Sequence, residues 1–261
     1  MKKVKAIVLR AAGTNCDIET AYAFRLAGAE AELVHINRLK EKEKKLSDYH
    51  ILAIPGGFTY GDDIASGKIL ANELKYALMD EIRNFISSGR LIIGICNGFQ
   101  VLVKAGLLPD FSKDAANIDV TLSINDSAKF EDRWCYLKRA KSRCVFAKDM
   151  PETIYLPVAH GEGKFIPKNK AVLERLKQNG QVVFRYVNDK GKSAGYPWNP
   201  NGSIDNIAGI CDATGRILGI MPHPERHIEL TQHPRWTEGG PKHPHGLSIF
   251  KNAVTYCEKK L

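Results

Sequence analysis

A cysteine flanked by glycines is the part of this sequence best suited to chemistry. Cys96 lies in the segment GICNG (residues 94–98), at the end of the apolar run LIIGI and before the helical run FQVLVKAG. This order predicts a nucleophile elbow, a sharp strand-to-helix turn in which the glycines let strand and helix pass closely. The helix N-terminus favours a thiolate, and the N–H of Asn97 is a candidate oxyanion donor. The alternative is a small, buried, inert cysteine, but the paired glycines favour the nucleophile.

A cysteine nucleophile in acyl transfer needs a base and a group that orients the base. Candidates for both follow the apolar run RILGI, in the segment MPHPE, as His223 and Glu225. Pro224 biases His223 towards an extended backbone, which we expect to bring the two side chains to the same side. Taken alone, the segment also fits a proline-stiffened surface loop. The elbow favours the catalytic interpretation.

Two consecutive glycines end another apolar run. Gly56 and Gly57 follow HILAIP, where backbone N–H groups can approach a ligand closely. We expect them to supply the second half of an oxyanion hole, an interpretation compatible with a simple tight turn. The nearby GDDIASGK is not a phosphate loop, because its glycines are too far apart and no hydroxyl residue follows its lysine. GEGK at residues 161–164 fails the same test.

The elements that position these residues predict an α/β fold. Over the first hundred residues, apolar runs alternate with amphipathic stretches in the order β-α-β-β-α-β-α. The strand runs are apolar throughout, which is typical of a mostly parallel sheet covered by helices on both faces. The expected strands are residues 4–9, 31–36, 50–57 and 91–95, and the expected helices are residues 18–29, 69–89 and 97–108. Gly28, Gly89 and Gly106 are placed to end those helices.

The second half of the chain has shorter apolar segments, which predict an added antiparallel section. These segments are residues 119–124, 134–140, 153–159, 181–187, 206–212 and 216–222. Residues 212–215, DATG, predict a hairpin turn, and residues 247–260 predict a closing helix. We find no linker or repeat, so we expect a single domain over residues 1–261.

Composition excludes several classes of protein. Hydrophobic residues are 44% and charged residues 26% of the 261 residues, which is ordinary for a globular protein. No apolar run is long enough to span a membrane, and the N-terminus lacks the features of a secretory signal. The six scattered cysteines form no metal or disulfide pattern, so we expect a reduced, cytoplasmic setting.

Charge and the remaining cysteines and histidines are less informative. The formal charge of +9 is spread along the chain, which favours a solvated surface over nucleic-acid binding. Cys16, in GTNCD, lies at another strand-to-helix turn and is the best-placed of the other cysteines. The histidine- and proline-rich segment 227–246 has irregular spacing, which favours a partner interface over a metal site.

Together, PGGF, GICNGFQ and HPE resemble the motifs of the class I, triad-type glutamine amidotransferases. Longer blocks are similar to the glutaminase subunits of phosphoribosylformylglycinamidine synthases. They are VLRAAGTNCDIET, PGGFTYGDDIASGKI, GICNGFQVL, LPVAHGEGKF, YPWNPNGSIDNIAGICD and GIMPHPER. The blocks span most of the chain. The resemblance implies the flavodoxin-like sheet of that family.

The resemblance also implies a mechanism and its residues. Cys96 would attack the side-chain amide of glutamine, His223 would shuttle the proton and Glu225 would orient His223. A thioester would form and be hydrolysed to glutamate. The backbone around Gly56, Gly57 and Asn97 would form the oxyanion hole. His160, in AHGEGKF, would lie near the glutamine site, although a histidine at a strand end is more often structural.

Partners follow from the same resemblance. Ammonia would pass to a large synthase subunit that converts formylglycinamide ribonucleotide to formylglycinamidine ribonucleotide in purine biosynthesis. ATP and magnesium would bind there, a small bridging subunit would complete the complex, and this chain would hold no cofactor or metal. Neither nucleic acid nor membrane is expected as a partner. Two alternatives keep the triad: the glutaminase of another synthase, or a free-standing γ-glutamyl hydrolase. A third is a basic nucleic-acid-binding or scaffold protein on an inactive fold.

Overall fold

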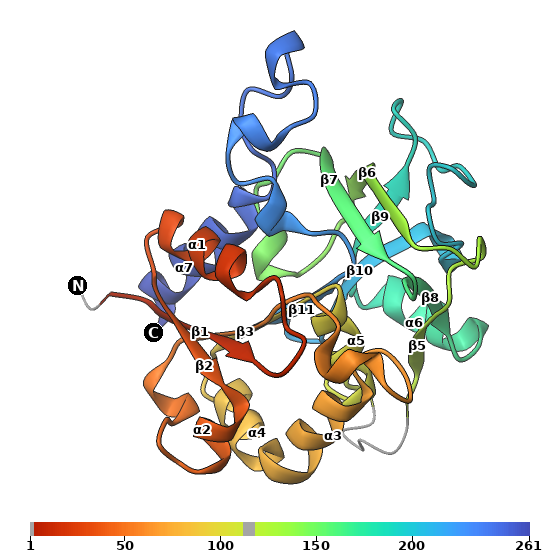
Figure 1. Ribbon diagram of the computed structural model, residues 1–261. Coiled ribbons are helices and arrows are strands. Elements are labelled where there is room, and N and C mark those ends of the chain that lie inside the picture. The colour runs from red at the N-terminus through yellow and green to blue at the C-terminus, as the bar shows by residue number, and fades with distance from the viewer. Residues whose placement is uncertain (1–2, 112–117) are drawn as a thin grey trace.

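A nine-stranded sheet organises the molecule (Figure 1). The computed structural model describes residues 3–111 and 118–261. In spatial order the strands are β2 (Glu30–His35), β1 (Lys5–Arg10), β3 (Ile51–Ile54), β4 (Leu91–Ile95), β11 (Ile217–Ile220), β10 (Ile207–Cys211), β9 (Val182–Val187), β6 (Glu131–Arg139) and β7 (Thr153–His160). A separate antiparallel pair consists of β5 (Val120–Ser123) and β8 (Lys164–Pro167).

The two halves of the large sheet differ in direction, as the sequence predicts. Strands β2, β1, β3, β4 and β11 run parallel, whereas β10, β9, β6 and β7 pair antiparallel. All residues of β3, β4 and β11 are buried, which fits apolar strands covered on both faces. Strands from both halves of the chain thus share one sheet. The single-domain prediction remains a prediction.

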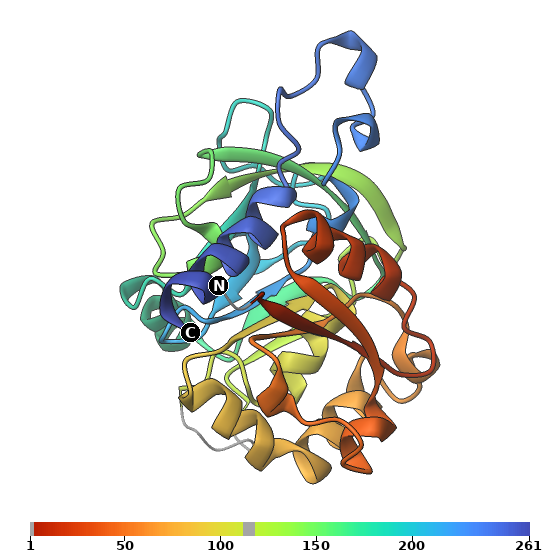
Figure 2. The ribbon, with the colours of Figure 1, turned by 90° about the vertical axis from the view of Figure 1, so that its left-hand side faces the viewer.

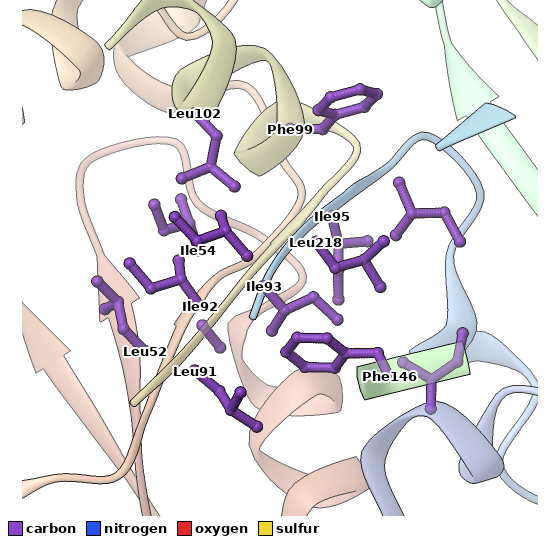
Figure 3. Packing of buried hydrophobic residues seen from close by; sticks show 14 of the residues in the cluster. Leu52, Ile54, Leu91, Ile92, Ile93, Ile95, Phe99, Leu102, Phe146 and Leu218 are labelled. Atoms are coloured by element: carbon purple, nitrogen blue, oxygen red, sulfur yellow. The ribbon is translucent and has the colours of Figure 1, made fainter. Parts of the chain in front are cut away.

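Helices cover both faces of the parallel half (Figures 1 and 2). On one face α1 (Asp17–Leu26) packs beside α7 (Leu247–Lys260), with Phe24 and Phe250 in edge-to-face contact at 4.9 Å between ring centroids. On the other face lie α3 (Lys68–Ala77), α4 (Met79–Ser87) and α5 (Asn97–Lys104). Figure 3 shows Leu102 of α5 and Phe146 on opposite sides of β4. The core therefore encloses the strand that leads to Cys96.

Local elements differ from prediction in three places. The helix predicted over residues 69–89 is two helices, because the backbone leaves helical geometry at Leu78 (φ −132°, ψ 5°). The prediction missed α2 (Ile36–Lys40), because five residues are too few to show a helical period. The His35 ring caps the N-terminus of this helix. The prediction also missed β8 and α6 (Lys170–Gln178). Positive φ at Gly28, Gly89 and Gly106 confirms the predicted helix ends.

Strand β11 departs on one edge from the antiparallel pairing expected for the second half of the chain. Its hairpin with β10, through residues 212–215, is antiparallel as predicted. Its other edge pairs parallel with β4, from Ile217 beside Ile92 to Ile220 beside Ile95. This placement brings the carboxyl ends of β4 and β11 to the same edge of the sheet. No helix within residues 3–111 and 118–261 has the length and apolar character needed to cross a membrane.

Candidate active site

The predicted elbow at Cys96 is present. Cys96 has φ 51° and ψ −106°, a backbone conformation that costs energy for a residue with a side chain. It lies between β4 and α5, and a Cβ on Gly98 would come within 1.9 Å of the Ile54 carbonyl oxygen. A Cβ on Gly94 would lie 2.5 Å from the Gly98 oxygen. Both glycines are therefore required for the crossing of strand and helix.

Parallel pairing of β4 with β11 brings His223 to the elbow. The Cys96 N–H donates to the carbonyl of Ile220, the last residue of β11, at 2.8 Å. Three residues later, the His223 N–H donates to the Pro157 carbonyl of β7 at 2.8 Å. The histidine backbone is thus fixed by strands on both sides. Carboxyl ends of parallel strands are the usual place for a ligand site in such sheets.

His223 and Glu225 form a buried pair. Nδ1 of His223 lies 2.6 Å from Oε1 of Glu225, and both side chains are at most 2% exposed. Burial alone would lower the pKa of His223, but the Glu225 carboxylate and then Cys96 outweigh it and raise that pKa well above its usual value. His223 has an extended backbone (φ −99°, ψ 93°), as predicted, and Glu225 reaches the ring from the short 3-10 turn Pro224–Arg226 that follows. The predicted contact is present.

The other ring nitrogen of His223 is available to Cys96. Nε2 is buried and has no hydrogen-bond partner among the described residues. His223 and Cys96 both lie close to Gly56. A Cβ on Gly56 would lie 2.8 Å from Cε1 of His223 and 3.5 Å from Cβ of Cys96. The thiol itself lies 3.6 Å from the Ala159 carbonyl oxygen. The structure thus brings together the three predicted triad residues.

The predicted oxyanion residues Gly56, Gly57 and Asn97 lie at the same edge of the sheet, and each makes different contacts. Gly56 leaves room for the imidazole, and Gly57 (φ +145°) allows close approach of the Gly13–Asn15 backbone. Asn97 is the first residue of α5, where N–H groups lack intrahelical acceptors. Its side chain accepts from Thr59 Oγ1 at 2.7 Å and donates to the Asp62 carboxylate at 3.0 Å. Asn97 therefore ties the turn after Gly57 to the elbow. Oxyanion donation remains a prediction.

His160 has its ring in a buried polar network. Nδ1 lies 3.2 Å from Oδ1 of Asn125, and Nε2 lies 3.4 Å from Nδ2 of Asn201. These contacts assign the neutral tautomer with the proton on Nδ1. The Asn125 amide also donates to the His160 carbonyl at 2.8 Å. The arrangement favours a structural role for this ring, which supports the loop beyond β7.

The protonation of His160 leads to a stability prediction. Burial first, and then the charge of His223, lower the pKa of His160 to about 3, whereas an unfolded histidine titrates near ~6.5. Between these values the unfolded chain binds more protons, so stability is lost as pH falls below the unfolded pKa. At pH 5 this costs about 2 kcal/mol. We expect His160→Gln to lose this part of the acid sensitivity, measured by urea unfolding at pH 7 and 5. Equal pH slopes for both proteins would contradict it.

Comparison with known families agrees with this geometry. The family model described as a CobB/CobQ-like glutamine amidotransferase domain matches residues 3–257. The chain belongs to this glutamine amidotransferase family. The amidotransferase is 50% identical over 261 residues to phosphoribosylformylglycinamidine synthase subunit PurQ of Dehalococcoides mccartyi, covering 99% of this chain and 100% of the relative. It is 46% identical to PurQ of Archaeoglobus fulgidus, covering 99% of this chain and 98% of the relative.

Solved structures show the same fold. A chain in the structure of PurLQS from Thermotoga maritima superposes on the amidotransferase with a TM-score of 0.75 and 30% identity, covering 98% of this chain and 99% of that chain. A putative GMP synthase subunit from Thermoplasma acidophilum has a TM-score of 0.60 and 16% identity, covering 99% and 96% of the two chains. The second likeness shows the fold alone. The predicted flavodoxin-like α/β fold is confirmed.

Two residues of the amidotransferase site carried no strong sequence signal. Cys16 lies beside the triad, with its sulfur 4.0 Å from Nδ1 of His223, and Arg226 lies 3.3 Å from that sulfur. Donor atoms of Cys16, His223 and Glu225 lie within 4.8 Å of one another, a spacing that metal sites share. The positive charge of the Arg226 guanidinium disfavours a metal cation at this position. The hydrogen bond between His223 and Glu225 already explains the short distance between those two side chains. For Cys16, the one indication in the sequence was its position at the strand-to-helix turn in GTNCD.

Three of the four histidines in the 227–246 segment pack inward at its base. His227 Nδ1 donates to the Tyr155 carbonyl at 2.9 Å, and the Tyr155 N–H donates to His245 Nδ1 at 3.1 Å. The rings of His227 and His233 lie 5.2 and 5.6 Å from that of Trp134. Beyond this cluster the segment projects away from the sheet (Figure 1), and the Trp236 side chain is exposed. His227, His233 and His245 thus anchor the base of the projection, whereas His243 is exposed. The role of the segment as a partner interface stays a prediction.

Proposed function

We propose that this chain is the glutaminase subunit of a phosphoribosylformylglycinamidine synthase, with Cys96, His223 and Glu225 as its catalytic residues. The observation that carries the catalytic assignment is the buried His223–Glu225 pair, 2.6 Å apart, beside a cysteine held at positive φ on an elbow. Relatives named as the PurQ subunit of this synthase match 98–99% of the chain at 46–50% identity. Membership of the family and the site geometry therefore support the same chemistry.

The geometry supports a two-step acyl transfer. The Cys96 thiol gives its proton to His223 as its sulfur attacks the side-chain carbonyl carbon of glutamine, and N–H groups around Gly56, Gly57 and Asn97 stabilise the resulting oxyanion. The C–N bond then breaks as His223 gives its proton to the leaving nitrogen, which departs as ammonia. Water attacks the thioester, its proton passes to His223, and the C–S bond breaks to release glutamate. Glu225 keeps the Nδ1 proton in place through both steps.

The ammonia requires an acceptor protein. The Thermotoga maritima relative forms part of PurLQS, and we propose that this chain likewise assembles with a small third subunit and with a large synthase subunit. ATP and magnesium would bind the large subunit, which converts formylglycinamide ribonucleotide to formylglycinamidine ribonucleotide. We propose no cofactor or metal for this chain, no nucleic-acid or membrane partner, and a cytoplasmic location, where its six free cysteines stay reduced.

Reconstitution tests this assignment. The chain is mixed with the two other subunits of the synthase, and formylglycinamidine ribonucleotide is measured with glutamine or with ammonium as nitrogen source. We expect glutamine-dependent synthesis only when this chain is present, and glutamate release that rises on adding formylglycinamide ribonucleotide and ATP. Glutamate release without any coupling to synthesis would instead indicate a free-standing hydrolase or the subunit of another synthase. Absence of both activities, with no labelling of Cys96 by 6-diazo-5-oxonorleucine, would sink the enzyme assignment.

A further inference from the structure

Cys16 is a second buried cysteine beside the proposed triad. It precedes α1 and is 1% exposed. The carboxyl end of β1 leads to it, just as β3, β4 and β11 lead to Gly56, Cys96 and His223. Its N–H donates to the Gly56 carbonyl at 3.2 Å, and its carbonyl accepts from the Thr20 hydroxyl at 2.6 Å. The backbone of Cys16 is therefore fixed both to the turn after β3 and to the first turn of α1.

The sulfur of Cys16 fills the space between three groups. It lies 4.0 Å from Nδ1 of His223 and accepts from Nη2 of Arg226 at 3.3 Å. A Cβ on Gly56 would come within 3.1 Å of it. On the far side of the guanidinium, Nε of Arg226 pairs with Glu19 of α1 at 3.0 Å. The thiol thus separates the Arg226 cation from the imidazole that Glu225 orients.

Chemistry explains why a thiol suits this position. Burial raises the pKa of the Cys16 thiol to about 11, against the lowering effects of His223 and Arg226, so the group stays uncharged at neutral pH. A neutral sulfur is a weak acceptor, and at 4.0 Å it does not compete with Glu225 at 2.6 Å for the Nδ1 proton. It still accepts from Arg226, which fixes the guanidinium on the side of the sulfur away from the ring.

We propose that Cys16 is a positioning residue for the proposed glutaminase reaction. Its uncharged thiol holds the Nδ1 edge of His223 between the Gly56 turn and Arg226, so that Nε2 keeps facing Cys96. The inference rests on the proposed function, and it assigns Cys16 no contact with substrate. The charged and titratable groups around the imidazole are Glu225 and Arg226 on its own segment, Cys96 on the elbow, Cys16 before α1 and His160 at the end of β7.

Kinetics of Cys16 variants in the reconstituted complex test the proposal. For Cys16→Ala we expect kcat for glutamine hydrolysis to fall about 30-fold with KM changed less than about threefold, since a tilted base misaligns proton transfer without removing substrate contacts. Cys16→Ser, which keeps a neutral polar group, should recover most of the loss. Ammonium-dependent synthesis should stay at the wild-type rate in both variants.

A second readout does not depend on turnover. Alkylation of Cys96 by iodoacetamide, followed by mass spectrometry across pH, reports how well His223 stabilises the thiolate. We expect the midpoint pH of alkylation to rise by about one unit in Cys16→Ala. Cys257→Ala, an equal truncation at a buried cysteine of α7, should leave kcat and midpoint at wild-type values. Cys16→Ala values that match those of Cys257→Ala would overturn the proposal.

Two precautions keep the result decisive. If Cys16→Ala does not fold, Cys16→Val retains the buried volume without a group that accepts from Arg226, and it should show the same loss and the same shift. Wild-type behaviour of the valine variant would equally overturn the proposal. A wild-type complex that releases no glutamate would sink the proposed function instead. The alkylation midpoints still compare the variants in that case, so the two failures are distinguishable.

Discussion

Cys96→Ser should abolish glutamine-dependent synthesis of formylglycinamidine ribonucleotide and leave ammonium-dependent synthesis intact. The expected fall in kcat with glutamine is about 10⁴-fold or more, because a serine hydroxyl at the elbow is far less acidic and less nucleophilic than a thiol. The serine is nearly isosteric, so the strained elbow and its Ile220 contact persist. The measurement is the initial rate of the reconstituted complex with each nitrogen source.

Matched controls separate chemistry from folding in that experiment. Cys257→Ser makes the same atomic change at a buried cysteine of α7 and should keep both activities near wild type. Retention of glutamine-dependent synthesis by Cys96→Ser would remove Cys96 as nucleophile. Loss of ammonium-dependent synthesis as well would show that the substitution had disrupted assembly, and the titration of complex formation would then identify the step affected.

Glu225→Gln is expected to lower kcat for glutamine hydrolysis by about 10³-fold at neutral pH. The carboxylate holds the proton on Nδ1 of His223 at 2.6 Å, whereas the amide can offer a donor to the same nitrogen and reverse the tautomer. The carboxylate also raises the pKa of His223 against the effect of burial. Without it that pKa falls, so the imidazolium that must protonate the leaving nitrogen is lost at a lower pH. The pH profile of kcat should move in the acid direction.

The control for Glu225→Gln is the same substitution at Glu229, an exposed glutamate a few residues further along the chain. Glu229 bonds the Tyr22 hydroxyl at 2.6 Å and does not touch His223, so Glu229→Gln should keep the wild-type rate and profile. A Glu225→Gln enzyme with unchanged kcat would rule out an orienting role for the carboxylate. A large rise in KM at unchanged kcat would place Glu225 in substrate binding instead.

A chain of contacts near the site links an exposed turn to the elbow, and it offers a route for coupling between the subunits. Asn97 links the elbow to the turn at Thr59 and Asp62, where Tyr60, Asp62 and Ile64 all have positive φ. Phe58 and Ile64 of this turn are exposed. A contact that moved the turn would therefore be transmitted to the first residue of α5, next to the nucleophile. This gives a physical basis for the expected rise in glutamate release when the synthase binds its substrates.

The amino-acid sequence determined the local features of this protein. GICNG was enough to predict the elbow, because only glycines at 94 and 98 let α5 cross β4 and β3 at such short range. HPE predicted the pairing of His223 with Glu225, which lie two residues apart and need only a turn to meet. Continuous apolar runs predicted buried parallel strands, since the period of the pattern reports burial on both faces.

Tertiary structure alone decided how those features meet. Insertion of β11 between β4 and β10 sets His223 beside Cys96, and local periodicity does not encode which strands become neighbours. Cys16 and Arg226, which are 210 positions apart in the chain, form a hydrogen bond beside His223. His160 was predicted to lie near the glutamine site, which stays a prediction, and Asn125 and Asn201 from distant segments hold its ring. Contacts of this kind depend on strand order and on packing between distant segments, which are fixed only when the whole sheet assembles.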